Sequence, residues 1–133
     1  MKNESISLQL NKAKENKFLY ESTLDNILEL TECNEIPEWI IDSITELLDT
    51  ENWEELNNRF YKNLAFGTGG MRGRTIGNYI TKAERGKTKG KETPKFAAVG
   101  SNTLNEITVL RATKALFLHI TKWLAEESIL AQP

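Results

Sequence analysis

Glycine is confined to one part of this 133-residue chain. All eight glycines lie between Gly67 and Gly100, and the first 66 residues contain none. Because glycine adopts backbone conformations closed to other residues, it collects in turns and loops and is disfavoured inside helices. The distribution therefore predicts a helical first half, a glycine-rich middle section and a change of architecture near residue 65.

The first half carries apolar side chains at helical spacing. From Leu8 to Leu30 they recur every three or four residues, as on an amphipathic helix. Pro37 and Glu38 suit the first turn of a second helix, and Asp49 or Thr50 is expected to cap a third. The side chains expected to form the buried faces of the second and third helices are Trp39, Ile40, Ile44, Leu47, Leu48, Trp53, Leu56 and Phe60.

The second half predicts short strands, a surface loop and one long helix. Residues 74–76 and 79–81 are β-branched or aromatic and favour strands, whereas residues 82–95 are polar and basic. Ser101, Asn102 or Thr103 is expected to cap a helix that runs to about Glu127. This helix is apolar on much of its circumference, so we expect it to be packed on more than one side. A strand–helix unit that ends on its helix lacks the next strand, which suggests that further chain belongs downstream.

Composition excludes several classes of protein. One cysteine, Cys33, rules out an internal disulfide framework, and no signal-peptide core opens the chain, so we expect a cytoplasmic location. No apolar run is long enough for a membrane helix. Residues 1–71 have a net charge of −8 and residues 72–95 one of +6, so a basic block begins at Arg72. This block lacks interleaved aromatic residues and the chain is acidic overall, which argues against nucleic-acid binding.

The glycine-rich segment Phe66–Gly73 has the composition of an anion-binding loop. Its four glycines allow backbone N–H groups to approach a ligand, and Arg72 adds a planar fork suited to phosphate or carboxylate. Its spacing matches neither a Walker loop nor a dinucleotide-binding fingerprint. Carboxylates with metal-ligand spacing are not found in the sequence.

Two longer motifs make the interpretation specific. Residues 64–77, L-A-F-G-T-G-G-M-R-G-R-T-I-G, resemble the opening motif of the α-D-phosphohexomutase superfamily, the phosphoglucomutases and phosphomannomutases. Residues 99–109, V-G-S-N-T-L-N-E-I-T-V, resemble the family's entry into its first long helix, and Arg111-Ala112-Thr113 resembles the continuation. The resemblance covers residues 35–127. It implies an α/β fold, with a helical N-terminal extension at 1–63 and, at 64–133, an incomplete α/β/α first domain with few short strands and one long helix.

The resemblance also implies a reaction. These isomerases transfer a phosphoryl group between a phosphoserine and a hexose or pentose phosphate, with Mg²⁺ neutralising charge. Arg72 matches the family's loop arginine, which stabilises the transferring phosphoryl group or assists proton transfer. Thr68, Gly69 and Gly70 would bind phosphate or substrate, and Arg74 fits either the site or the surface.

The chain departs from the family in what it lacks. The T-A-S-H-N-P serine motif, the aspartate-rich magnesium loop and the sugar-selecting loop are absent, so no residue here is assigned to hold metal. The sequence therefore indicates an N-terminal fragment, inactive alone, whose partners are the missing C-terminal domains and a phosphosugar. Two alternatives remain: a stand-alone phosphate- or phosphosugar-binding module, and a helical interaction protein without catalysis.

Overall fold

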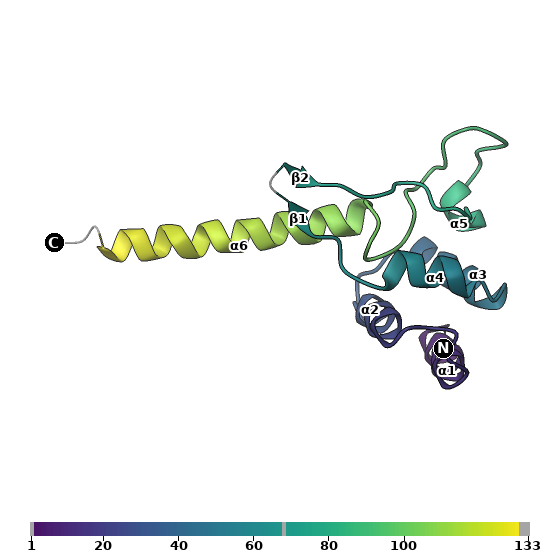
Figure 1. The fold of residues 1–133 in the computed structure, drawn as a ribbon. Coiled ribbons are helices and arrows are strands. Elements are labelled where there is room, and N and C mark those ends of the chain that lie inside the picture. The colour runs from purple at the N-terminus through teal and green to yellow at the C-terminus, as the bar shows by residue number, and fades with distance from the viewer. Residues whose placement is uncertain (1, 68, 131–133) are drawn as a thin grey trace.

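The computed structural model describes residues 2–67 and 69–130 (Figure 1). Four helices form its first half: α1 (Lys2–Glu15), α2 (Glu21–Thr31), α3 (Glu38–Asp49) and α4 (Trp53–Phe60). The predicted helical first half is confirmed, but the run from Leu8 to Leu30 forms two helices rather than one. The chain turns at Lys17, whose φ of 61° interrupts the helix, so that α1 and α2 can pack against each other.

These four helices enclose the hydrophobic core. α1 packs on α2 and α3, and α4 packs on α2 and α3. Leu10, Ile27, Ile44 and Leu56 are completely buried, one from each helix. From the second half of the chain, Val99 joins this cluster. The apolar spacing of the first half is therefore the pattern of a small helical bundle, whose helices each turn one face inward.

The cap of α4 differs from the expectation. Asp49 and Thr50 belong to the end of α3, and the Asn52 side chain accepts the backbone N–H of Glu55 at 3.3 Å. The predicted caps were wrong because Glu51, with a φ of 53°, turns the chain after α3 and delays the next helix. Glu38 lies in the first turn of α3 as expected, whereas Pro37 is the N-cap residue, one position before the helix.

The middle of the chain contains very little strand. The strands β1 (Phe66–Gly67) and β2 (Gly70–Met71), each two residues long, pair antiparallel and form a hairpin. The strands predicted at 74–76 and 79–81 do not form. Residues 72–81, here called the arm, are irregular and include several bends, and their only ladder contact is an isolated bridge between Arg74 and Thr103. The arm leads to the short helix α5 (Lys82–Arg85), which packs on α3.

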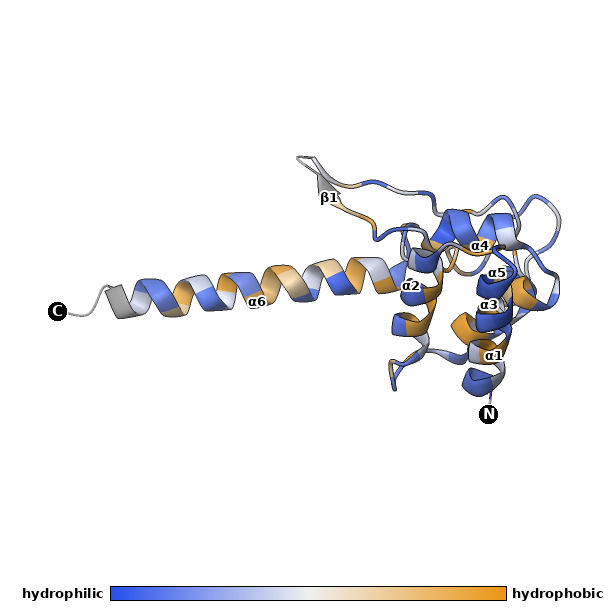
Figure 2. Cartoon of the chain, turned by 60° about the horizontal axis from the view of Figure 1, so that its bottom comes forward, coloured by the Kyte–Doolittle hydropathy of each residue, from blue (hydrophilic) through white to orange (hydrophobic). Residues whose placement is uncertain are grey.

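One long helix, α6 (Glu106–Leu130), projects away from the other helices (Figure 1). Its cap is Asn105 and not residues 101–103, because the side-chain oxygen of Asn105 accepts the backbone N–H groups of Ile107 and Thr108. The expected packing on several sides was wrong for most of its length. Apolar segments recur along the whole projecting helix in Figure 2, and large apolar side chains such as Phe117 and Trp123 are more than half exposed.

The fold is thus mainly helical, and the α/β expectation is met only in part. In the described ranges the only paired strands longer than an isolated bridge are β1 and β2. The expected division between residues 63 and 64 falls in the extended segment that joins α4 to β1, and it stays a prediction. None of the helices described is both long and apolar enough to cross a membrane.

Candidate functional site

The glycine-rich segment folds as a tight hairpin. Phe66 pairs with Met71 and Gly67 with Gly70, and Gly69 lies in the turn between the two strands. Gly70 has a φ of 108°, a region that residues with a side chain rarely adopt, which explains a glycine at this point of the turn. Thr68, a predicted phosphate-binding residue, lies outside the described residues.

Arg72 follows the hairpin directly and is exposed. A Cβ atom built on Gly69 would lie 3.9 Å from the Nη2 atom of Arg72, so the guanidinium folds back over the turn. Within the described part of the chain, no hydrogen bond or ion pair occupies its donors. The hairpin therefore brings Gly69, Gly70 and Arg72 together, with a cation available beside the turn.

Arg74 is placed differently. Its side chain is exposed and its Nη1 atom donates to Oδ1 of Asn78 at 3.0 Å, within the arm. Its backbone carbonyl accepts the N–H of Leu104 at 2.8 Å, which joins the arm to the segment that precedes α6. Arg74 can contribute positive charge near the hairpin, but its guanidinium is already partly engaged with the arm.

The second motif, residues 99–109, contacts the end of α4 and contains the start of α6. The backbone N–H of Asn102 donates to the carbonyl of Arg59 at 2.9 Å, and its side-chain amide donates to the carbonyl of Asn58 at 3.2 Å. Asn105 caps α6, and the backbone N–H of Asn105 in turn donates to Oγ1 of Thr108 at 3.0 Å. Both asparagines of this motif therefore have structural roles: Asn102 bonds to the end of α4, and Asn105 caps α6. The pairing of Asn105 with Thr108, three residues apart, is a capping signal that could have been recognised in the sequence.

Arg111 is a basic side chain near the hairpin that sequence reasoning did not include in the site. Together with Leu64 and Met71 it borders a hollow of about 190 Å³ between the hairpin and the first turns of α6. Its guanidinium donates to Glu29 at 3.1 Å and to Asn63 at 3.4 Å, which fastens α6 to the helices of the first half. Its position depends on a tertiary contact with Glu29 of α2, which no local sequence pattern predicts.

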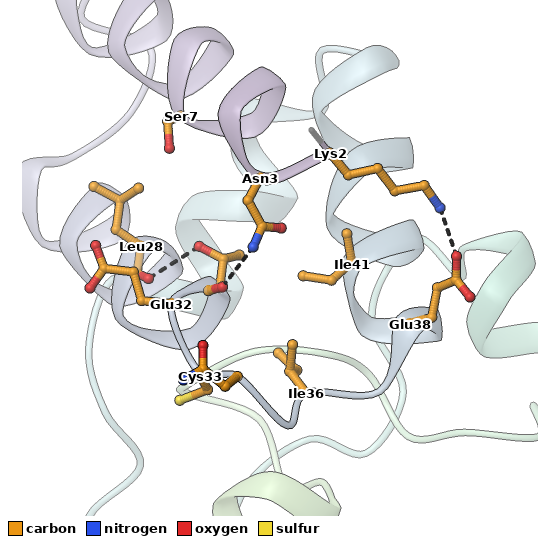
Figure 3. Close-up of a pocket in the computed structure, with 11 residues that line it drawn as sticks. Lys2, Asn3, Ser7, Leu28, Glu32, Cys33, Ile36, Glu38 and Ile41 are labelled. Atoms are coloured by element: carbon orange, nitrogen blue, oxygen red, sulfur yellow. Dashed lines mark hydrogen bonds and ion pairs between the residues drawn. The ribbon is translucent and has the colours of Figure 1, made fainter.

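A second hollow, of about 400 Å³, lies far from these residues in the sequence, between α1, the end of α2 and the start of α3 (Figure 3). Its polar side chains bond to neighbours: Asn3 donates to the carbonyl of Thr31 at 3.1 Å, and Lys2 pairs with Glu38 at 2.9 Å. Cys33 lines the same hollow and is exposed. Lys2 and Asn3 are thus engaged with neighbouring groups, and we assign no chemistry to this hollow.

The far end of the arm is tied to α3 by a tyrosine. The hydroxyl of Tyr79 donates to Oε1 of Glu46 at 2.8 Å, and the other oxygen of Glu46 accepts the backbone N–H of Lys82 at 2.8 Å. This hydrogen bond to Glu46, together with partial burial and the nearby negative charge, raises the pKa of Tyr79 above its ordinary value. Tyr79 is therefore held as a neutral donor that fixes the arm.

The described residues contain no group of three or more His, Cys, Asp and Glu side chains placed to hold a metal ion. Comparison with protein-family models, curated proteins and solved structures found no match to this chain.

Proposed function

We propose that this chain is the N-terminal part of a phosphosugar mutase of the α-D-phosphohexomutase type, an isomerase of carbohydrate metabolism. The observation that carries the proposal is the hairpin of residues 66–71, which gathers Gly69 and Gly70 beside the exposed guanidinium of Arg72. A compact glycine turn next to an uncommitted arginine suits a phosphoryl group, which needs close backbone approach and a planar cationic fork.

In this proposal each site residue has a separate task. Arg72 stabilises negative charge on the phosphoryl group during transfer, which is where preorganised donors lower the barrier most. Gly69 and Gly70 leave room for the phosphate to reach the backbone, Thr68 is assigned to phosphate binding from the sequence motif, and Arg74 adds positive charge nearby. The phosphoserine that donates the phosphoryl group has to come from outside this chain.

The remainder of the enzyme has a surface on which to pack. The exposed apolar residues of α6 would be covered by the missing part of an α/β/α first domain, with the C-terminal domains as further partners. Burial of such side chains removes them from water and stabilises the assembly. Mg²⁺ would neutralise phosphate charge in the whole enzyme, but the described residues do not fit a magnesium site, so no step is assigned to the metal here.

A titration tests the proposal. Glucose 1-phosphate is added to the isotopically labelled chain while the amide signals of residues 66–74 are followed by NMR. We expect saturable shifts in the parent and an affinity at least about tenfold weaker in Arg72→Ala, because a charge-assisted hydrogen bond contributes roughly 1.5–3 kcal/mol.

Lys87→Ala is the matched control, since Lys87 belongs to the same basic block and is exposed. Equal affinity of Arg72→Ala and the parent would contradict the assignment of Arg72. Continuation of the reading frame into a T-A-S-H-N-P motif would support the mutase assignment independently.

The exposed face of α6 also favours a second candidate, a helical interaction protein without catalysis. The two candidates differ in the titration. A parent chain that shows no shift with glucose 1-phosphate, yet binds a protein partner through α6, would favour the second.

A further inference from the structure

The most deeply buried charges of this chain lie outside the candidate site. Arg59 is completely buried, Glu84 is 1% exposed and Glu55 is 3% exposed. We call these three residues the Arg59 cluster. Buried charges of this kind are costly unless every one of them is paired and hydrogen-bonded, so their partners indicate what the cluster is for.

All five guanidinium N–H donors of Arg59 are used. Nε donates to Glu55 at 2.7 Å, Nη1 to Glu84 at 2.5 Å and to the carbonyl of Val99 at 3.3 Å. Nη2 donates to the carbonyl of Tyr79 at 2.5 Å and to Glu84 at 3.4 Å. Two of these five acceptors are backbone carbonyls that belong to the arm and to the segment before α6.

Glu84 connects the same segments from the opposite side. Its carboxylate accepts the backbone N–H of Val99 at 2.8 Å, the backbone N–H of Thr81 at 3.1 Å and the hydroxyl of Ser43 at 3.0 Å. The cluster has one cation and two anions, and these neutral donors satisfy the oxygens of Glu84 that Arg59 does not fully occupy. The cluster thus joins α3, α4, α5, the arm and Val99.

Two glycines lie directly against Arg59, one from each sequence motif. A Cβ atom at Gly77 would lie within 2.3 Å of Nη2 of Arg59 and of Oε1 of Glu55. A Cβ atom at Gly100 would lie 2.6 Å from the carbonyl oxygen of Arg59. Real Cβ contacts essentially never come this close, so the two backbones reach the cluster only because both residues lack a side chain.

We propose that Arg59, held by Glu55 and Glu84, is the positioning residue of the phosphate-handling hairpin. Through Gly77 and Tyr79 it fixes the arm, which begins at Arg72, and through Val99 and Gly100 it fixes the segment that bonds to the arm. Gly77 is therefore required for close packing against Arg59 and is not part of the anion-binding loop. The inference rests on the proposed function for what the hairpin binds, but the positioning can be measured without any ligand.

Hydrogen exchange of the full chain, followed by mass spectrometry, tests the positioning. Arg59→Lys keeps the charge but loses the planar guanidinium, and one ammonium group cannot reach all five acceptors. We expect exchange in residues 72–81 and 97–104 to become at least about tenfold faster, while α1 to α3 change by less than about twofold. Arg85→Lys is the matched control, since Arg85 makes a single side-chain bond, to the carbonyl of Gly90, within the basic loop.

A second variant covers the case in which Arg59→Lys does not fold. Gly77→Ala leaves every charge in place and only adds a methyl group against the cluster, and we expect the same local increase in exchange. Unchanged exchange of the arm in both variants would overturn the proposal. Loss of protection in α1 to α3 in both variants would overturn it as well, since the cluster would then hold the bundle and not the hairpin.

The glucose 1-phosphate titration separates this inference from the proposed function. If the parent binds, Arg59→Lys should bind about tenfold more weakly although Arg72 is intact, and unchanged affinity would contradict positioning. If the parent does not bind, the proposed function fails, and the exchange experiment still decides whether Arg59 fixes the arm.

Discussion

Asn105 uses both ends of its side-chain amide to begin the longest helix. Its oxygen accepts the backbone N–H groups of Ile107 and Thr108 at 3.0 and 2.9 Å. Its nitrogen donates to the carbonyls of Ala98 and Gly100 at 3.1 and 2.9 Å. One residue therefore caps α6 and fastens it to the segment that supports the arm.

Replacement of Asn105 by alanine should cost more than the loss of an ordinary cap. Two helix N–H groups lose their partner, and the carbonyls of Ala98 and Gly100 each lose one of two donors, since Thr103 also donates to both. We therefore expect a loss of about 2–3 kcal/mol in the free energy of unfolding. Asn52→Ala is the matched control, because Asn52 caps α4 through a single bond and should cost about 1 kcal/mol. Urea denaturation followed by circular dichroism measures both, and equal losses would contradict the double role of Asn105.

The capping residues also show what a sequence pattern can and cannot decide. Residues 101–103 have the right chemistry to cap a helix, but other carbonyls occupy their side chains. Ser101 donates to the carbonyl of Lys62 and Asn102 to that of Asn58, both in distant parts of the sequence, and Thr103 donates to the nearby carbonyl of Ala98. Local propensity identified the class of residue, and for Ser101 and Asn102 the choice among neighbours depended on tertiary contacts.

At the scale of elements, the sequence predicted helices well and strands poorly. Apolar periodicity is a local property, and it identified the helical regions of α2, α3, α4 and α6. Strand formation needs a partner. The arm bonds instead to non-strand acceptors and donors: the carbonyl of Thr75 accepts the N–H of Ala98 at 2.8 Å, and the carbonyl of Tyr79 accepts from Arg59 at 2.5 Å. The hairpin was predictable as a glycine loop, whereas the placement of Arg72 against its turn was not.

The outer half of α6 should be the least protected long element of the molecule. From Leu116 to Glu127 every residue is exposed, and an isolated helix of this length is marginal in water. At low protein concentration we expect amides of residues 116–127 to exchange about a hundredfold faster than those of α3, which packs on α1, α4 and α5. Hydrogen exchange measures the two peptides in one experiment. Equal protection would mean that another surface covers α6.

The whole molecule exposes more surface than a compact chain of its mass. Its accessible area is 9239 Å² for 15.1 kDa, whereas the scaling for folded monomers gives about 7,100 Å². The large side chains that are exposed along α6 are Val109, Leu110, Leu116, Phe117, Leu118, Ile120, Trp123 and Leu124. The difference of about 2,000 Å² is comparable with the total area that a stable protein interface buries.

A chain with this much exposed apolar surface should associate with itself when no other partner is present. We expect its weight-average mass, measured by sedimentation equilibrium, to rise above 15.1 kDa with concentration. Phe117 and Leu124 are seven residues apart on one face of α6, so the double variant Phe117→Glu, Leu124→Glu should remain monomeric, since a charge buried in such a contact is costly. Leu8→Glu makes the same kind of change at an exposed leucine of α1 and should associate like the parent. A parent that stays monomeric at high concentration would show that the exposed face of α6 does not drive association. That result would contradict the proposed packing of further mutase structure on α6.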